Sequence, residues 1–473
     1  MIEDGALALR ASMDAGQISA QDLMAETLAR VSRCNDRVNA IVSLRDPDIL
    51  MAEARAADQA AAAGWLHGIP IAIKDLDDAR GLPSTQGGVP AHAATVATED
   101  ALFVARLRAA GAIIIGKTNA PEFGLGSHTV NRVFGATRNP YDTNLSAGGS
   151  SGGAAVALAT RMLSVADGSD MMGSLRNPAG WNNVYGMRPS WGLVPPNPQG
   201  EAFFKMLATH GPMARCPRDL AALLDTMAGR DALVPHGLDQ APSLPQIDQG
   251  ISHMRIGWLA DWGGALPTEP GVLDICEEAL SRFQELGHKV DPLAAPFDRE
   301  VLWSAWTTLR SFALAGSLGA LYADARTRAG LNPQSVWEIE RGLNLSAMQV
   351  HRASEMRSDW FRTAAILFDT CDVLALPSAQ MWPFDITLDW PRSIGATSMD
   401  SYHRWMEIVI PASLIGLPAI SVPVGFGGAK DMPMGLQLIG RHGSDAKLLN
   451  LAEHWHQATQ WPAQMAPDLI HRL

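Results

Sequence analysis

Several features are absent from this 473-residue sequence, and each absence argues against a class of protein. No apolar run approaches the ~20 residues that a membrane-spanning helix needs. The N-terminus, Met1-Ile2-Glu3-Asp4, lacks the basic and apolar regions of an export signal. Four widely spaced cysteines without a CxxC pair argue against a disulfide framework or a zinc site: Cys34, Cys216, Cys276 and Cys371. We therefore expect a cytoplasmic protein that does not bind membranes.

Positive charge is also scarce. The 37 Lys and Arg are outnumbered by 49 Asp and Glu, which gives a net charge of −12 and argues against a nucleic-acid-binding surface. The length allows a sizeable core, and we find no internal repeat or low-complexity tract. The expected partners are a small-molecule substrate and, at most, a second copy of the chain in a homodimer.

The stretch from Leu145 to Arg188 carries the clearest chemistry. It contains Gly-Gly-Ser-Ser-Gly-Gly at 148–153, then a small apolar helix, a short strand near 163–166 and a second serine, Ser174, at the strand end. Ser150 and Ser151 each fit the nucleophile elbow of α/β-hydrolases, whereas a plain Gly/Ser loop is about as compatible with these residues. A phosphate-binding loop is disfavoured because its lysine is missing.

Two lysines each end a buried apolar strand. Lys74 follows Gly-Ile-Pro-Ile-Ala-Ile at 68–73, and Lys117 follows Ile-Ile-Ile-Gly at 113–116. Burial lowers the pKa of a lysine and can leave it neutral, so that it serves as a base for a serine. Periodicity alone does not choose between the two lysines, since either could instead reach out to water.

Together these motifs resemble the amidase signature family. The resemblance rests on Gly-Gly-Ser-Ser-Gly-Gly, on Asp170-Met-Met-Gly-Ser-Leu-Arg176 with its serine 24 residues after Ser150, and on the strand that ends at Lys74. It extends to Gly116–Asn119, Phe134–Pro140 and Gly416–Ser421. One departure is Met172, where the family usually has glycine; the 6-aminohexanoate cyclic-dimer hydrolase branch also lacks that glycine.

The resemblance implies a Ser-cisSer-Lys triad of Ser174, Ser150 and Lys74, with a cis peptide bond before Ser150 and Lys117 in a supporting role. Phe123, Gly124 and Ser151 would border the substrate. The tight turn at 171–174 is expected to form an oxyanion hole from the backbone N–H groups of Met171, Met172, Gly173 and Ser174. No metal or organic cofactor is expected.

Side chains around the nucleophile turn allow two interpretations. Met171, Met172 and the nearby Trp181 could form an apolar acyl pocket, or the methionines could simply pack beneath the loop. Asp170 and Arg176 flank the turn with opposite charges, and we expect them to form an ion pair that supports it.

The expected fold is α/β, a single large domain over residues 1–473 with a mixed, twisted central β-sheet covered by helices on both faces. Strands from Gly68 to Ile439 are expected to join one sheet. Within the domain, residues 66–192 form the catalytic core segment and 300–370 a helical, insert-like region. Residues 379–400 form a long loop that could wall the pocket, act as a lid or simply lie on the surface.

The predicted function is hydrolysis of a carboxamide, carbamate or related non-peptide C–N bond in a small, largely apolar substrate, with esters as a side activity. The sequence does not identify the substrate. One alternative is the glutamine-hydrolysing A subunit of a tRNA amidotransferase, although its usual Asp-Thr-Gly-Gly-Ser turn is missing. A non-catalytic binding relative is the other, but all three triad residues are present.

Overall fold

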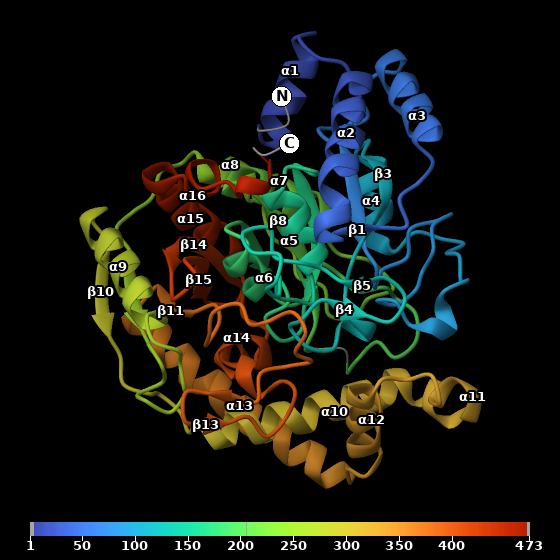
Figure 1. The fold of residues 1–473 in the computed structure, drawn as a ribbon. Coiled ribbons are helices and arrows are strands. Elements are labelled where there is room, and N and C mark those ends of the chain that lie inside the picture. The colour runs from blue at the N-terminus through green and yellow to red at the C-terminus, as the bar shows by residue number, and fades with distance from the viewer. Residues whose placement is uncertain (1–3, 205, 471–473) are drawn as a thin grey trace.

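A computed structural model describes residues 4–204 and 206–470, and its largest element is a mixed eight-stranded sheet (Figure 1). Two of its neighbouring pairs, β10–β9 and β9–β11, are parallel, and the others are antiparallel. The strands in spatial order are β10 (Lys289–Pro292), β9 (Arg255–Trp258), β11 (Val373–Pro377), β15 (Met432–Gly440), β14 (Ala419–Gly427), β7 (Tyr185–Arg188), β8 (Thr209–Ala214) and β6 (Val165–Asp170).

The expectation that all strands join one sheet is wrong. β2 (Pro70–Lys74) and β3 (Ile113–Thr118) run parallel and form a separate three-stranded sheet with β1 (Ile41–Val42). At the junction with β6, the backbone N–H of Lys74 donates to the Asp167 carboxylate (3.1 Å). β2 and β6 therefore meet through a side chain here, and they belong to different sheets. Two short hairpins, β4 (Val130–Asn131) with β5 (Gly135–Ala136) and β12 (Ser393–Ile394) with β13 (Thr397–Ser398), complete the strands.

Helices cover both sides of the sheets, as expected for the α/β class (Figure 1). The N-terminal segment is helical as predicted, and Ser19 caps its second helix by accepting the Asp22 N–H. The first nine helices are α1 (Ala6–Asp14), α2 (Ala20–Val38), α3 (Pro47–Gln59), α4 (Leu102–Ala109), α5 (Gly152–Ala159), α6 (Arg176–Trp181), α7 (Pro217–Met227), α8 (Leu244–Ile247) and α9 (Val272–Glu285).

The region 300–370 is helical and forms a layer along one side of the molecule, at the bottom of Figure 1. It consists of α10 (Arg299–Ala323), α11 (Ala325–Arg328), α12 (Pro333–Leu343) and α13 (Ala347–Thr370). The remaining helices are α14 (Ile410–Leu414), α15 (Asp445–Thr459) and α16 (Trp461–Gln464). Short 3₁₀ turns lie at Pro90–His92, Glu122–Gly124, Arg404–Val409 and Asp468–Ile470.

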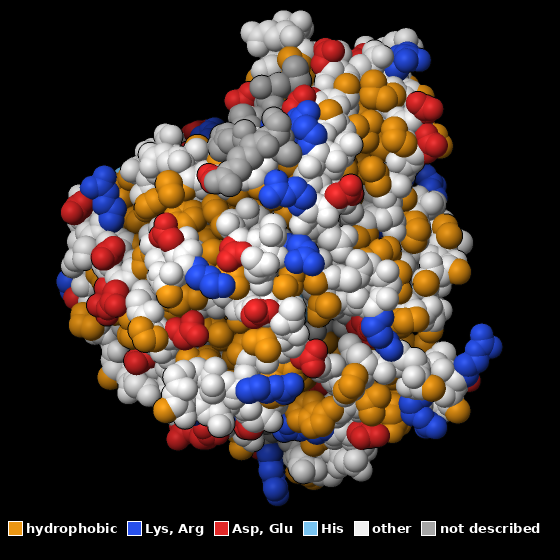
Figure 2. All heavy atoms as spheres, in the orientation of Figure 1, with side chains coloured by type: hydrophobic (Ala, Val, Ile, Leu, Met, Phe, Trp, Pro, Cys, Tyr) orange, Lys and Arg blue, Asp and Glu red, His pale blue; other side chains and the backbone are white. Residues whose placement is uncertain are grey.

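Apolar side chains fill most of the space around both sheets. The small, fully buried helix α5 packs against this core, where its alanines allow close approach. Acidic and basic side chains are interspersed over the face shown in Figure 2. Within the described ranges, no helix combines the length and apolar character needed to cross a bilayer.

Candidate active site

Lys74 ends β2 with its side chain fully buried against a group of serines. Its Nζ lies 2.8 Å from Ser150 Oγ, 2.8 Å from Ser151 Oγ and 3.0 Å from Ser169 Oγ. The strand thus delivers an amine to the serine loop, which lies 76 residues further along the chain. Lys74 and Ser150, two residues of the expected triad, are therefore in direct contact.

The serine loop is held closely on several sides. The Gly149–Ser150 peptide bond is cis, as the resemblance implies. The carbonyl of Gly149 accepts the Ser127 hydroxyl (2.6 Å). At Gly153 a Cβ atom would lie 2.3 Å from the Asn119 backbone nitrogen, so only glycine fits there. The glycines therefore allow close backbone approach and do not make the loop a flexible connector.

Lys117 occupies a different environment from Lys74. Its Nζ donates to the Asp77 backbone carbonyl and lies 3.9 Å from Asp75 Oδ1. In the ranges that the structure describes, no hydrogen bond joins Lys117 to either serine of the loop. Of the two strand-end lysines, only Lys74 can exchange a proton directly with Ser150.

Ser174 lies on a tight turn between β6 and α6. Gly173 has φ +79°, a left-handed conformation that glycine adopts without strain, whereas the neighbouring Met172 has no positive φ. A side chain at position 172 in place of the family's usual glycine is therefore compatible with the turn. Ser174 is 6% exposed, against 0% for Lys74 and 2% for Ser150, so it is the most accessible of the three.

Asp170, at the end of β6, holds the turn through hydrogen bonds to its backbone. Its carboxylate accepts the backbone N–H groups of Gly173 (2.9 Å) and Leu175 (3.2 Å). This finding corrects the expected oxyanion hole, because the Gly173 N–H is already occupied by an internal acceptor. The expected donors that remain are the N–H groups of Met171, Met172 and Ser174.

The same carboxylate forms a buried bidentate ion pair with Arg176, at 3.0 Å for Nε and 3.0 Å for Nη2. Arg188 lies 3.5 Å away, and the other Arg176 N–H groups donate to the Gln437 and Ser413 side chains and to the Val409 carbonyl. Burial alone would raise the pKa of Asp170, but the two arginines lower it to about 2. Asp170 is thus a permanent anion that holds the turn, and Arg176 is fully engaged by protein groups.

The electrostatics of Lys74 suit a base. Burial lowers the pKa of Lys74 from 10.5 to about 8, although Asp77, Asp167 and Asp170 act in the opposite direction. Burial, followed by the charge of Asp77, raises the pKa of Asp167 to about 7. Sequence analysis missed Asp167, although an acidic residue within a short strand of small residues is a signal for a buried polar contact.

The two methionines of the turn have different environments. Met172 is 3% exposed and belongs to the main core, so the packing interpretation holds for this residue. Met171 is only partly buried, and its Sδ lies 3.2 Å from Arg310 Nη1. Trp181 is fully buried, stacks on Trp405 and therefore packs behind the turn.

The expected substrate-side residues divide into two groups. Gly124 lies beside the triad, because a Cβ there would be 3.3 Å from Ser150 Oγ. Phe123 packs against an apolar cluster that includes Leu125 and Tyr402. Ser151 is fully buried and its hydroxyl lies 2.8 Å from Lys74 Nζ, and its place beside the substrate stays a prediction.

The 379–400 loop is tied to the serine loop. The carbonyl of Phe384 accepts the Ser146 N–H (2.8 Å), and the carbonyl of Ile386 lies 3.2 Å from His128 Nε2. The indole N–H of Trp382 donates a hydrogen bond to the Pro270 carbonyl, and Trp390 packs against the apolar cluster that contains Phe123. The first half of this loop is therefore anchored beside the site.

Sequence analysis also missed a buried polar cluster around Arg310 on α10. Arg310 is the one charged residue within 302–321, a stretch of apolar and small residues, and such isolation signals a buried partner. Its Nε donates to Glu338 (2.7 Å) and its Nη2 to Tyr402 (2.7 Å). Through Met171 this cluster touches the nucleophile turn.

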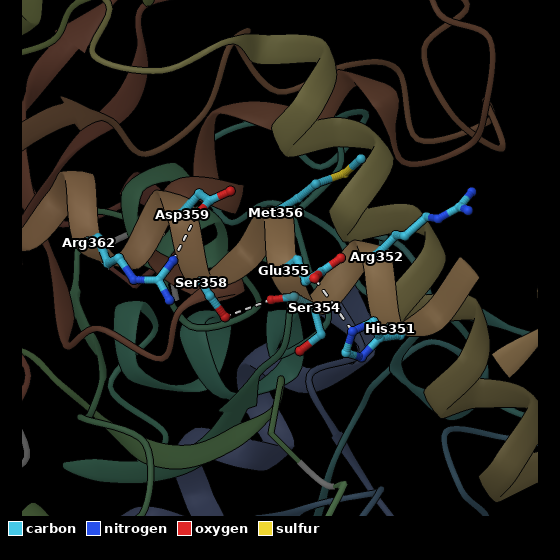
Figure 3. Close-up of a pocket in the computed structure, with 8 residues that line it drawn as sticks. All are labelled: His351, Arg352, Ser354, Glu355, Met356, Ser358, Asp359 and Arg362. Atoms are coloured by element: carbon cyan, nitrogen blue, oxygen red, sulfur yellow. Dashed lines mark hydrogen bonds and ion pairs between the residues drawn. The ribbon is translucent and has the colours of Figure 1, made fainter. Parts of the chain in front are cut away.

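Two cavities in the described part of the chain have no triad residue in their lining. A polar hollow of about 550 Å³ runs along the exposed face of α13, where His351 pairs with Glu355 and Arg362 with Asp359 (Figure 3). These pairs are three or four residues apart on one helix and satisfy each other. A larger apolar cavity of about 760 Å³ lies between α10, α12, α13 and the side chains of Phe203, Phe204, Met206 and Leu207.

Comparison with known proteins identifies the family of this chain. The amidase family model matches residues 22–449. An acylamidase of Rhodococcus erythropolis is 33% identical over 98% of this chain and 97% of its own length. The A subunit of the glutamyl-tRNA(Gln) amidotransferase of Burkholderia thailandensis is 34% identical over 96% of this chain and 97% of its own.

Solved structures match over nearly the whole chain. A bacterial aryl acylamidase of the amidase signature family superposes with a TM-score of 0.91 at 27% identity, covering 99% of this chain and 98% of the other. The structure of 6-aminohexanoate cyclic dimer hydrolase gives 0.89 at 26% identity, covering 99% of both chains. This chain is therefore a member of the amidase signature family, a hydrolase of amide C–N bonds.

Proposed function

We propose that the enzyme cleaves a carboxamide, carbamate or related C–N bond of a small, largely apolar substrate through an acyl-enzyme on Ser174. The observation that carries the proposal is the 2.8 Å contact between Lys74 Nζ and Ser150 Oγ, in a loop whose Ser151 N–H donates to the backbone carbonyl of Ser174 (3.3 Å). A serine hydroxyl needs a neighbouring base to attack an amide at useful rates. A buried lysine with a pKa of about 8 is such a base once it is neutral.

In this mechanism, Ser174 Oγ attacks the carbonyl carbon while its proton passes to Ser150 Oγ and the proton of Ser150 passes to Lys74 Nζ. The oxyanion then accepts hydrogen bonds from the backbone N–H groups of Met171, Met172 and Ser174. The relay runs backwards to protonate the leaving nitrogen as the C–N bond breaks. Water attacks the acyl-enzyme by the same route and releases the acid.

Labelling tests the identity of the nucleophile. A serine-directed phosphonyl fluoride should modify Ser174, as mapped by peptide mass spectrometry, and Ser174→Ala should abolish both the label and amide hydrolysis. Ser150→Ala serves as a matched control, because it removes the relay but leaves the nucleophile in place. A label on Ser151 with Ser174 untouched would return the nucleophile-elbow interpretation and refute this mechanism.

A substrate panel tests the class of substrate. Met171 on the turn and Phe123 next to Gly124 are apolar and only partly buried, and burying an unpaired charge among such side chains would cost several kcal/mol. Aryl and alkyl amides should therefore give higher kcat/KM than glutamine or asparagine. If the isolated chain preferred glutamine, the amidotransferase alternative, which the 34% identity to such a protein favours, would replace the proposal. A well-folded chain that cleaves no amide would favour a binding role.

A further inference from the structure

Arg310 connects the helical region with the nucleophile turn. It lies on α10 and is 2% exposed, with its guanidinium among side chains of three other segments. Nε donates to Glu338 Oε1 (2.7 Å), Nη2 to Tyr402 Oη (2.7 Å) and Nη1 to Met171 Sδ (3.2 Å). Met171 and Ser174 are three residues apart, so their Cα atoms are separated by no more than about 11 Å.

Two of the three guanidinium nitrogens of Arg310, Nε and Nη2, are held by buried oxygen acceptors. Glu338 Oε1 also accepts the Tyr402 hydroxyl (2.8 Å), and Oε2 accepts the Ser311 hydroxyl (2.6 Å). Although burial alone would raise the pKa of Glu338, Arg310 lowers it, so the carboxyl is ionised. The pair therefore carries no net charge, and Arg310 is oriented by strong oxygen acceptors on one side only.

The third nitrogen, Nη1, donates to the Met171 sulfur, which is a poor partner for a buried cation. A thioether sulfur is a weak acceptor, and a poorly satisfied buried donor costs free energy. The side chain of Met171 is flexible and partly exposed, so it can move aside. An oxygen on a bound substrate would be a better acceptor than the sulfur it displaces.

We propose that Arg310 is a specificity-determining residue whose Nη1 binds an uncharged oxygen acceptor of the substrate, such as a second amide carbonyl or an ether, at the place where Nη1 now contacts Met171. The inference rests on the proposed function and refines it. Because Glu338 neutralises Arg310, a substrate carboxylate would leave a net negative charge in this buried cluster. The favoured substrate is thus largely apolar but carries one neutral acceptor in addition to the bond that is cleaved.

Two matched anilides test this role. They have acyl chains of equal length, one with an in-chain amide or ether oxygen and the other with methylene at the same positions. Hydrogen bonds to charged groups correspond to about tenfold or more in kcat/KM, and we expect that preference in the wild type. The ratio of the two values is the readout, because a purely structural loss lowers both together.

Variants then assign the preference to Arg310. Arg310→Lys keeps a cation beside Glu338 but loses the planar guanidinium, whose Nη1 reaches Met171. The double variant Arg310→Met, Glu338→Met removes the buried ion pair without leaving a lone charge. In both, the ratio should fall towards one. The matched control is Arg299→Met with Glu407→Met, which removes another ion pair of α10 (2.7 Å) and should leave the ratio unchanged.

The outcomes separate the two proposals. A wild type that cleaves both anilides without preference, or a preference that survives in both Arg310 variants, would overturn the role of Arg310 and leave the proposed function standing. Failure of the wild type to cleave any amide would overturn the proposed function itself, and the specificity inference with it.

Discussion

Replacing Lys74 by methionine should change how the stability of the protein depends on pH. The pKa of Lys74 is lowered from 10.5 to about 8 by burial. Below pH 8 the folded protein holds the charged Lys74 amine away from water, and the full desolvation penalty lowers the free energy of unfolding. Between pH 8 and 10.5 the unfolded chain binds more protons than the folded one, so the free energy of unfolding rises with pH.

The lowering from 10.5 to about 8 corresponds to about 3 kcal/mol. Wild-type protein should therefore gain about 3 kcal/mol relative to Lys74→Met as the pH rises from 8 to 10.5. Lys74→Met also loses the hydrogen bonds to Ser150 and Ser151. This loss shifts the free energy of unfolding of the variant by the same amount at every pH from 8 to 10.5. Asp167 has a pKa of about 7 and is already mostly ionised at pH 8.

Urea denaturation at equilibrium, at several pH values from 7 to 10.5, measures this difference directly. Lys447→Met is the matched control, because Lys447 lies exposed on α15 and its loss should leave the pH dependence of the wild type intact. If the curves of wild type and Lys74→Met ran parallel from pH 8 to 10.5, Lys74 would not titrate as a buried amine. The base assignment would then lose its electrostatic support.

Three further predictions concern the same site. The value of kcat/KM for a neutral amide should rise with pH through about 8, because only neutral Lys74 accepts a proton; a profile flat from pH 6 to 9.5 would contradict this. Lys74→Ala should abolish turnover, whereas Lys117→Ala, which loses contacts to Asp77 and Asp75, should mainly lower thermal stability; the reverse order in activity assays would refute the assignment. Asp170→Asn leaves Arg176 buried without its ion pair and should lower the free energy of unfolding in urea by about 3–5 kcal/mol. The control Glu285→Gln breaks the exposed pair with Arg282 and should lower it by at most about 1 kcal/mol. Equal effects of the two variants would refute the structural role of Asp170.

Local patterns predicted the elements of this fold well but not how they assemble. Ser19 as an N-cap and the buried strand that ends at Lys74 follow from capping chemistry and apolar runs, which are properties of neighbouring residues. The division into two sheets was not predictable, because the strands that meet between them are distant in the sequence, as the contact between Lys74 and Asp167, 93 residues apart, shows. Strand order is a tertiary property that the periodicity of a strand does not encode.

The same distinction applies to the site. The resemblance to the amidase signature family implied Lys74 and Ser150, and the structure brings these two side chains within hydrogen-bonding distance. Spacing did not reveal that Asp170 occupies the Gly173 N–H, since a local carboxylate competes with the substrate for backbone donors only in one turn geometry. Arg310 was missed because its neighbours come from distant segments, and its isolation in an apolar helix was the one available signal.

The junction between the two sheets has a consequence for assembly. The amine of the triad is supplied by the small N-terminal sheet, whereas Ser174 follows an edge strand of the large one, and β2 and β6 meet through Asp167. Neither half carries a complete proton relay. During synthesis on the ribosome, hydrolytic competence can therefore arise only after the chain beyond β6 has folded back on the first 120 residues. Recovery of activity on refolding should accordingly report the docking of the two sheets, a later event than the formation of either one.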